Sequence, residues 1–338
     1  MTSSDSPIKT VSGCPVNEFL KTGQESLKLK VVAGTPGLRA VIRDKTLNRP
    51  ALALTGYWKY FGNKRIQLFG AGEMAYLRDL KKENQMTVLK EMARRKVPCI
   101  IISRNLAPTR TMYKLAEEKK LPLIRTCMNT RDFAATATLV LEELFAPSTV
   151  EHGTMMDIKG IGTLIKGSSG IGKSECALHL IDQGYSLIAD DAVHIKLLNE
   201  RELMATSNEL NRNYMECRGM GIINIADLFG IGATQLKKPI QLVITLKEWA
   251  PGMVEDRTGL EENFYELLGQ AIPHIIIPVR PGRNIAQLVE VAAMVQALKI
   301  AGYNPAQKFN ERLISHLAKE KKAVQHTPSK FLAKEFDC

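Results

Sequence analysis

The sequence predicts an α/β protein, and three observations support this. Short apolar, β-branched runs alternate with stretches of helical spacing over most of the chain. The run Pro98–Ser103 is largely apolar, which is typical of a buried parallel strand. A glycine-rich turn at 167–172 lies between an apolar run and a helical stretch, as in the strand–loop–helix units of such folds.

The length of 338 residues suggests two domains, each large enough to bury its own core. We expect a small N-terminal α/β domain at residues 1–146 and a second α/β domain, which contains the glycine-rich turn, at 147–318. The turn-forming stretch Ala146–Thr149 marks the boundary. Residues 319–338 are polar and lysine-rich, so we expect a disordered tail there.

In the first domain, apolar strand-like runs alternate with stretches of helical spacing. Strand-like runs occupy Leu27–Val32, Ala51–Leu54, Ile66–Leu68, Pro98–Ser103 and Leu121–Ile124. Helical spacing occupies Ala75–Arg95, Thr109–Lys119 and Ala134–Phe145. Strands separated by helices predict a parallel sheet. This domain contains no recognisable catalytic pattern and alone indicates no function.

The second domain begins near Val150 and also contains strand-like runs and helical stretches. Its strand-like runs are Ile158–Ile165, Leu187–Ala189, Val193–Leu198, Ile240–Leu246 and His274–Val279. A long helix is predicted over Asn284–Ala301, with Asn284 as its N-cap and Gly302 just past its end.

Composition excludes several classes of protein. No apolar run approaches the ~20 residues of a membrane span, and the polar N-terminus has no signal-peptide core. The six cysteines are scattered without a C-x-x-C pair, which favours reduced thiols in a cytoplasmic protein. The net charge is +11, but the basic residues are dispersed and no RNA-binding aromatic motif or zinc pattern accompanies them. We therefore expect no nucleic-acid partner.

The glycine-rich turn matches the phosphate-binding pattern G-x-x-x-x-G-K-[ST]. Its residues are Gly167, Ser168, Ser169, Gly170, Ile171, Gly172, Lys173 and Ser174. Glycines let backbone N–H groups converge on an anion, and the following helix N-terminus adds partial positive charge. Lys173 is then expected to reach the β- and γ-phosphates of a nucleotide, and Ser174 to ligate Mg²⁺. The alternative is a glycine-rich turn with a surface lysine.

Acidic residues and a histidine lie near this loop in the sequence. Asp190 and Asp191 end a predicted strand beside the loop, where the Mg²⁺ ligands of phosphate-loop enzymes usually lie. Adjacent residues on a strand point to opposite faces, so the two carboxylates can have different roles. His152 precedes the strand that leads into the loop. A turn aspartate and a structural histidine remain the alternatives.

Three further loops place charged side chains among glycines or prolines. Glu216–Gly221 combines a glutamate and an arginine, and could be a site loop or a salt-bridged turn. Asp256–Gly259 could be a turn or an arginine clamp on a transferring phosphoryl group. Pro278–Asn284 holds two arginines around a Pro-Gly turn at the end of a strand, which suits phosphate recognition or a tight turn.

Several ordered stretches together resemble one family, that of HPr kinase/phosphorylase, over roughly residues 19–312. The stretches are Asn48–Tyr57, Gly167–Ser174, Ala189–Val193, Arg218–Ile223 and Ile277–Asn284. The resemblance implies a C-terminal phosphate-loop kinase domain similar to phosphoenolpyruvate carboxykinase, behind a small N-terminal α/β domain. It also implies a cytoplasmic homohexamer.

The resemblance further implies a bifunctional enzyme that regulates the sugar phosphotransferase system. One reaction transfers phosphate from ATP with Mg²⁺, or from pyrophosphate, to a serine of the protein HPr. The other uses inorganic phosphate to remove that group, giving pyrophosphate.

Site residues carry over by position in the matched motifs. His152 matches the active-site histidine, Lys173 the loop lysine and Asp191 the acid/base. Ser174 and Glu216 match metal ligands. The remaining matches are Arg257, an active-site arginine, and the dephosphorylation loop of Pro278, Val279, Arg280, Pro281, Gly282 and Arg283.

Departures from the family pattern are small. Cys217 stands where a β-branched apolar residue is expected, and Thr258 where leucine is expected. Two other readings of the chain stay open at this point: a phosphate-loop metabolite kinase, and a non-catalytic nucleotide sensor. Intact His152, Asp191 and Arg257 argue against the sensor, because a sensor needs no acid/base.

Overall fold

The computed structural model describes residues 2–3, 7–253 and 259–325, and the chain divides into two compact units. The N-terminal unit comprises Ile8–Ser148 and Lys196–Arg201. The C-terminal unit comprises Thr149–Ile195 and Glu202–Cys338 together with Met1–Pro7. The division after Ser148 lies close to the boundary expected at 146/147, but two short segments belong to the unit that their sequence position does not suggest.

A five-stranded sheet forms the centre of the N-terminal unit, in the order β3-β8-β7-β6-β5. The strands are Leu29–Ala33 (β3), Leu123–Thr126 (β8), Ile100–Ile102 (β7), Ile66–Phe69 (β6) and Leu47–Asn48 (β5). Strands β5 to β8 are parallel and β3 pairs antiparallel with β8. The predicted parallel sheet is thus confirmed, with one antiparallel edge strand.

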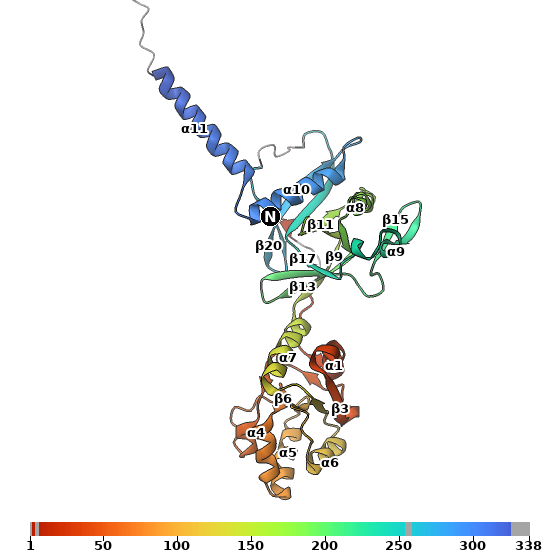
Figure 1. Cartoon of the computed structure of the whole chain (residues 1–338), viewed down its shortest axis with the longest axis vertical. Helices are drawn as coiled ribbons and strands as arrows, with labels where there is room; N and C mark the ends of the chain where they lie inside the picture. Colours follow the sequence, from red (N-terminus) through yellow and green to blue (C-terminus); the bar gives the residue numbers. More distant parts are fainter. Residues whose placement is uncertain (1, 4–6, 254–258, 326–338) are drawn as a thin grey trace, which may run out of the picture. The chain divides into compact units, whose positions relative to one another are not determined.

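Helices cover both faces of this sheet because neighbouring strand residues point in opposite directions. One face buries Phe69 and Ile102 against α4 (Ala71–Asp79), α5 (Lys82–Arg94) and α6 (Arg110–Lys119). The other face buries Leu68 and Ile101 against α1 (Val16–Thr22), α2 (Gln24–Leu27) and α7 (Thr130–Phe145). Figure 1 shows these two groups of helices on opposite sides of the sheet. The remaining short elements are β2 (Cys14–Pro15), η1 (Thr35–Gly37), β4 (Val41–Ile42) and α3 (Ala51–Leu54).

Two predictions for this unit were wrong. Ala51–Leu54 is the short helix α3 rather than a strand, because alanine and leucine favour a helix and a four-residue apolar run has no decisive period. The single helix expected over Ala75–Arg95 is divided into α4 and α5. The division falls at Leu80, whose extended backbone ends α4.

The C-terminal unit is built on a seven-stranded sheet in the order β1-β19-β20-β18-β11-β10-β12. The strands are Thr2–Ser3, Asn263–Leu267, Gln270–Val279, Leu242–Glu248, Ile161–Gly167, Thr154–Ile158 and Ser186–Ala189. Strands β11, β18 and β20 are mutually parallel, and β12 runs in the same direction because both β11 and β12 pair antiparallel with β10. The carboxyl ends of these four strands therefore meet at one edge of the sheet.

Helices α8 (Lys173–Asp182) and α10 (Ile285–Ile300) pack on this sheet and bury one apolar core with β10, β11 and β18. A second sheet has the order β17-β14-β13-β9, formed by Lys237–Pro239, Glu202–Thr206, Ala192–Leu198 and Ser148–His152. A hairpin is formed by β15 (Tyr214–Cys217) and β16 (Gly221–Asn224). The other elements are α9 (Ile225–Phe229), η2 (Ile231–Ala233) and α11 (Pro305–Gln325).

The structure of the C-terminal unit differs from the prediction at one strand and at the tail, and agrees with it at one helix. The expected strand Ile158–Ile165 is confirmed from Ile161 onward as part of β11, but Ile158 ends β10 instead. Lys159 (φ 53°) and Gly160 (φ 84°) both adopt left-handed backbone and form the turn of the β10–β11 hairpin between them. The helix α10 is confirmed, and the Asn284 side chain accepts a hydrogen bond from the Gln287 N–H at 3.1 Å. Helix α11 continues to Gln325, past the expected start of the disordered tail at residue 319.

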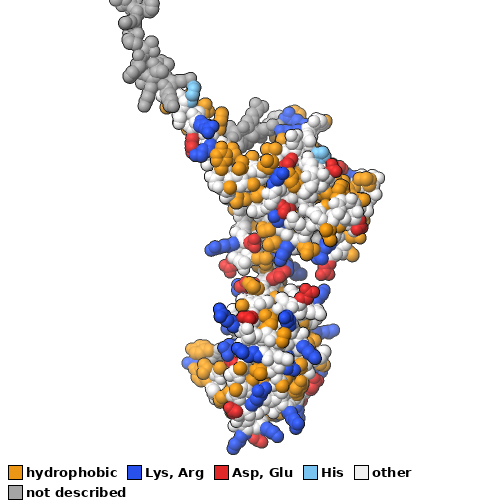
Figure 2. Space-filling view, in the orientation of Figure 1, with side chains coloured by type: hydrophobic (Ala, Val, Ile, Leu, Met, Phe, Trp, Pro, Cys, Tyr) orange, Lys and Arg blue, Asp and Glu red, His pale blue; other side chains and the backbone are white. Residues whose placement is uncertain are grey.

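The surface of the protein is mixed in charge (Figure 2), and the thiols of its described residues are free. On the face shown in Figure 2, lysines and arginines are dispersed among carboxylates. The five cysteines in the described part of the chain are free thiols. No helix within the described residues is by itself long and apolar enough to cross a membrane, and α10 and α11 pass that test only together, across a 74° bend.

Candidate active site

The phosphate loop connects the carboxyl end of β11 to the N-terminus of α8, as the sequence predicts. Gly170 (φ 84°) and Gly172 (φ 101°) have left-handed backbone, which other residues adopt only at a cost. A Cβ at Gly167 would lie 2.7 Å from the carbonyl oxygen of Leu246 on the neighbouring strand β18. These glycines therefore allow a loop that is tight and close to its neighbouring strand.

Lys173, the first residue of α8, lies across this loop. Its Nζ donates hydrogen bonds to the carbonyl oxygens of Gly167 and Ser168, each at 3.0 Å. The first N–H groups of a helix have no partners within the helix, and the helix dipole places partial positive charge there. Ammonium and free N–H groups thus meet at one place, which is an anion site.

Asp190 and Asp191 follow β12 at the same sheet edge, and their side chains have opposite environments. Asp190 is buried, and its carboxylate accepts hydrogen bonds from the Thr154 hydroxyl at 2.7 Å and from the Glu216 N–H at 3.4 Å. Burial raises the pKa of Asp190 above its ordinary value, although these hydrogen bonds lower it in part. Asp191 is 77% exposed and has left-handed backbone with φ 65°. Asp190 therefore positions the turn, and Asp191 is available to a substrate.

His152 lies beside Asp191. The two side chains approach to 3.8 Å between Nδ1 and Oδ1, and the Gly153 N–H donates to the Asp191 carbonyl at 3.1 Å. The structure thus brings together two predicted site residues that are far apart in the sequence. A contact that the sequence did not reveal supports them: the residue before His152, Glu151, forms a buried ion pair with Lys166, the residue before Gly167.

The β15–β16 hairpin contacts both parts of the site. Its Glu216 N–H binds Asp190, as described above. Its Arg218 donates from Nη2 to the Ser169 hydroxyl in the phosphate loop at 2.9 Å. Sequence reasoning placed Arg218 in a candidate loop but did not identify this contact, because no local pattern encodes it.

The loop after β20 lies at the same edge, since β20 pairs in parallel with β18. The Arg280 guanidinium stacks 4.4 Å from the centre of the Trp249 ring. Arg283 closes the turn by donating from Nη1 to the Pro278 carbonyl at 3.3 Å. Val279 ends the strand, and Pro281 and Gly282 form the turn. Trp249, which fixes one of the two arginines, was not found from the sequence.

The predicted arginine of the clamp and the predicted metal ligands are the remaining site residues. Arg257 and Thr258 lie outside the described residues. The described residues contain no cluster of three or more His, Cys, Asp or Glu side chains that could hold a metal ion. Mg²⁺ needs only one or two protein oxygens when it also binds substrate phosphates, so the hydroxyl of Ser174 and the carboxylate of Glu216 are suitable donors.

The fold and this site define a class: a phosphotransferase with a phosphate loop at the carboxyl ends of the four like-directed strands of a mixed sheet. Comparison with known families gives the particular family. The family description "HPr Serine kinase N terminus" matches residues 15–141, and "HPr Serine kinase C-terminal domain" matches residues 143–313. The chain belongs to the HPr kinase/phosphorylase family, which confirms the resemblance seen in the sequence.

Relatives of established name match nearly the whole chain. HPr kinase/phosphorylase of Leptospira biflexa is 40% identical over 95% of this chain and 99% of its own length. Proteins of the same name are 40% identical in Caldicellulosiruptor bescii, over 82% of this chain and 89% of theirs, and 39% identical in Listeria monocytogenes, over 87% and 94%. The solved HPr(Ser) kinase/phosphatase of Coxiella burnetii is 32% identical and covers 48% of this chain and 98% of its own, with a TM-score of 0.43.

Proposed function

We propose that the protein transfers phosphate from ATP to a serine of HPr, and that it also removes this phosphate with inorganic phosphate, giving pyrophosphate. One observation carries the proposal: the phosphate loop with Lys173, and Asp191 with His152 beside it, belong to one unit and one sheet edge. The names of the relatives that match this chain support the choice of HPr as substrate.

In the kinase direction, the β- and γ-phosphates of ATP bind at the loop. Asp191 accepts the proton of the substrate serine as its oxygen attacks the γ-phosphorus in line with the leaving oxygen. Lys173 and Arg257 offset the negative charge of the transferring group. Catalysis then consists mainly of positioning and charge stabilisation, as is general for phosphoryl transfer.

In the opposite direction, inorganic phosphate occupies the position of the γ-phosphate and attacks the phosphorus of phosphoserine. The departing serine oxygen needs a proton, which Asp191 returns. One carboxylate therefore serves as base in one reaction and as acid in the other, as microscopic reversibility requires.

Mg²⁺ has a place in this site without a dedicated protein cage. Ser174 and Glu216 would hold it, and it would supply positive charge that offsets the charge of the phosphates. The loop Pro278–Arg283 contributes two guanidinium groups suited to phosphate, and we assign it to the dephosphorylation reaction.

A homohexamer in the cytoplasm is the proposed form of the enzyme, acting in control of the sugar phosphotransferase system. Helix α11 supports self-association, because it exposes large apolar side chains that a second subunit can cover. These are Phe309, Leu313, Ile314 and Leu317.

Two assays test the proposal. In the first, purified protein receives γ-labelled ATP, Mg²⁺ and HPr. In the second, it receives phosphoserine-HPr and inorganic phosphate, and pyrophosphate is measured. We expect label on a serine of HPr and release of pyrophosphate, both lost in Lys173→Ala. If neither occurs while ATP still binds, the protein is a metabolite kinase or a nucleotide sensor instead.

A further inference from the structure

A pocket in the N-terminal unit lies at the end of its sheet, outside the site described above. Its volume is about 580 Å³, within the range of small-molecule sites. The lining residues are Leu47, Arg49, Leu68, Ala71, Gly72, Arg104, Thr130, Arg131, Ala134 and Thr138. This pocket belongs to the domain in which the sequence showed no functional pattern.

Much of the lining, including its three arginines, comes from the segments that follow four parallel strands. Arg49 follows β5, Ala71 and Gly72 follow β6, Arg104 follows β7, and Arg131 lies in the first turn of the helix after β8. Strands β5 to β8 are parallel, so these segments all leave the sheet at its carboxyl edge. Ligands of open α/β sheets bind in the crevice at this edge.

The pocket is strongly positive. Its lining has three arginines and no carboxylate. Arg49 is held by Glu73, which accepts hydrogen bonds from Nε and Nη2 at 3.0 Å each. In the described part of the chain, the Arg104 and Arg131 guanidinium groups make no hydrogen bond or ion pair. Two cations with unused donors therefore face a cavity beside a third that is already oriented.

The backbone holds Arg104 in place at some cost. Arg104 (φ 59°) and Asn105 (φ 52°) both have left-handed backbone. The Arg104 N–H donates to the carbonyl of Met128, just after β8, at 2.7 Å. The Asn105 N–H donates to the carbonyl of Thr126, the last residue of β8, at 2.8 Å. Strained backbone of this kind persists where the surrounding structure enforces it, and it is concentrated at binding sites.

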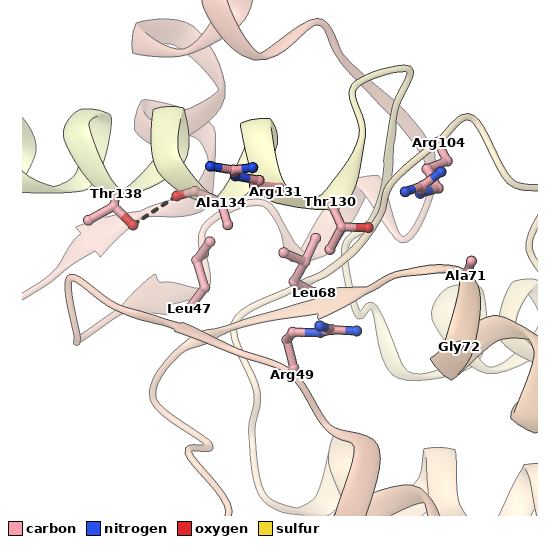
Figure 3. Close-up of a pocket in the computed structure, with 10 residues that line it drawn as sticks. All are labelled: Leu47, Arg49, Leu68, Ala71, Gly72, Arg104, Thr130, Arg131, Ala134 and Thr138. Carbon is pink, nitrogen blue, oxygen red and sulfur yellow. Dashed lines mark hydrogen bonds between the residues drawn. The ribbon is translucent and has the colours of Figure 1, made fainter.

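Two helix N-termini and an apolar floor complete the pocket. Ala71 begins α4 and Thr130 begins α7, and the Thr130 hydroxyl is fixed by a 2.8 Å hydrogen bond with Ser103. Figure 3 shows the Arg49 and Arg131 side chains on either side of Leu47 and Leu68, with Arg104 beyond Thr130. An anionic group fits the cationic rim, and a carbon skeleton fits the leucines between the arginines.

We propose that this pocket binds a small phosphorylated organic molecule. Its phosphate is bound by the guanidinium forks of Arg104 and Arg131 and by the N-terminal N–H groups of the two helices. Its organic part contacts Leu47 and Leu68. The N-terminal unit thus has a ligand site of its own, separate from the phosphate loop.

Phenyl phosphate is a suitable probe, since it joins a phosphate to an apolar ring. Its binding is measured by isothermal titration calorimetry on the full chain, with the phosphate loop saturated by a non-hydrolysable ATP analogue. Arg104→Ala/Arg131→Ala removes two pocket cations, and Arg39→Ala/Arg110→Ala removes two exposed arginines outside the pocket. We expect the pocket variant to weaken binding about tenfold or more, and the control to change it less than about twofold.

A second pair of variants introduces a side chain into open space. A Cβ at Gly72 would meet no atom within 4 Å, so Gly72→Ala causes no clash and Gly72→Asp extends from the same open position. The aspartate is favourable near a helix N-terminus but repels an anion in the pocket. Loss of phenyl phosphate binding in Gly72→Asp alone supports the site. Absence of binding beside the ATP analogue, equal loss in the control variants, or equal affinity for inorganic phosphate overturns it.

Discussion

Arg218 on the β15–β16 hairpin donates a hydrogen bond of 2.9 Å to the hydroxyl of Ser169 in the phosphate loop. The same hairpin binds the buried Asp190 through the N–H of Glu216. One short hairpin thus connects the phosphate loop to the aspartate pair. Four predictions test this site and the N-terminal unit.

Removing the Arg218 side chain should loosen the phosphate loop. Because one hydrogen bond contributes about 0.5–1.5 kcal/mol, Arg218→Ala should raise the KM for ATP by about two- to thirteenfold. Steady-state kinetics over a range of ATP concentrations measure this. Arg212→Ala, which removes an exposed arginine just before the hairpin, is the matched control. Equal kinetics in the two variants would show that the hydrogen bond has no role in the loop.

Gly170→Ala should damage nucleotide binding beyond its cost in stability. The new Cβ would lie 2.7 Å from Nη1 of Arg218, and the backbone φ of 84° is unfavourable for alanine. Gly184 is a matched control, with φ of 92° and no atom within 4 Å of a Cβ. Both variants should lose about 1–2 kcal/mol of unfolding free energy, but only Gly170→Ala should lose affinity for ATP in equilibrium dialysis. If both variants bind ATP with similar affinity, the close approach of Gly170 to Arg218 has no role in nucleotide binding.

Asp191→Asn should abolish phosphorylation and dephosphorylation of HPr together. An acid/base group contributes about 10²–10⁴-fold to a rate, so both activities should fall by that factor while ATP binding is retained. The labelled-phosphate and pyrophosphate assays described above measure the two rates. Asp182→Asn, which alters an exposed aspartate at the far end of α8, should leave both unchanged. Phosphate transfer at near wild-type rate by Asp191→Asn would show that Asp191 is not the acid/base group.

The Arg49–Glu73 pair should make the stability of the N-terminal unit depend on pH. Burial alone would raise the pKa of Glu73, whose side chain is 3% exposed. The hydrogen bonds and charge of Arg49, together with backbone hydrogen bonds from Glu73 and Gly70, outweigh burial and leave the pKa below the ordinary 4.5. The stabilisation is thus present above about pH 4.5 and is lost as the pH falls through the lowered value. Arg49→Ala should lower the free energy of unfolding by about 1–3 kcal/mol at neutral pH, a range that allows for the partial exposure of Arg49. The loss should be smaller in acid, where Glu73 is protonated.

Urea unfolding at several pH values measures this difference. In a Trp249→Phe background, Trp58 is the remaining tryptophan and its fluorescence reports the N-terminal unit. Arg39→Ala serves as the control. A cost that does not change with pH would mean that Glu73 is not the group responsible.

The sequence predicted features whose signals are local. The phosphate loop, the N-cap of α10 and the buried strand near Ile101 follow from short patterns of glycine, capping residues and apolar runs. The turn at Lys159 was missed because apolar residues flank it on both sides, so the two strands looked like one. The contact between Arg218 and Ser169, and the pocket of three arginines, depend on residues far apart in the sequence, which no local pattern encodes.

The assignment of chain segments to the two units has a practical consequence. Residues 1–7 belong to the C-terminal unit and 196–201 to the N-terminal unit. Cutting the chain once after Ser148 would give two fragments, each lacking a segment that packs with it in the whole protein. A genetic dissection of this enzyme therefore requires circular permutation or grafted segments, and a single protease nick at that point would leave each fragment holding part of the other's fold.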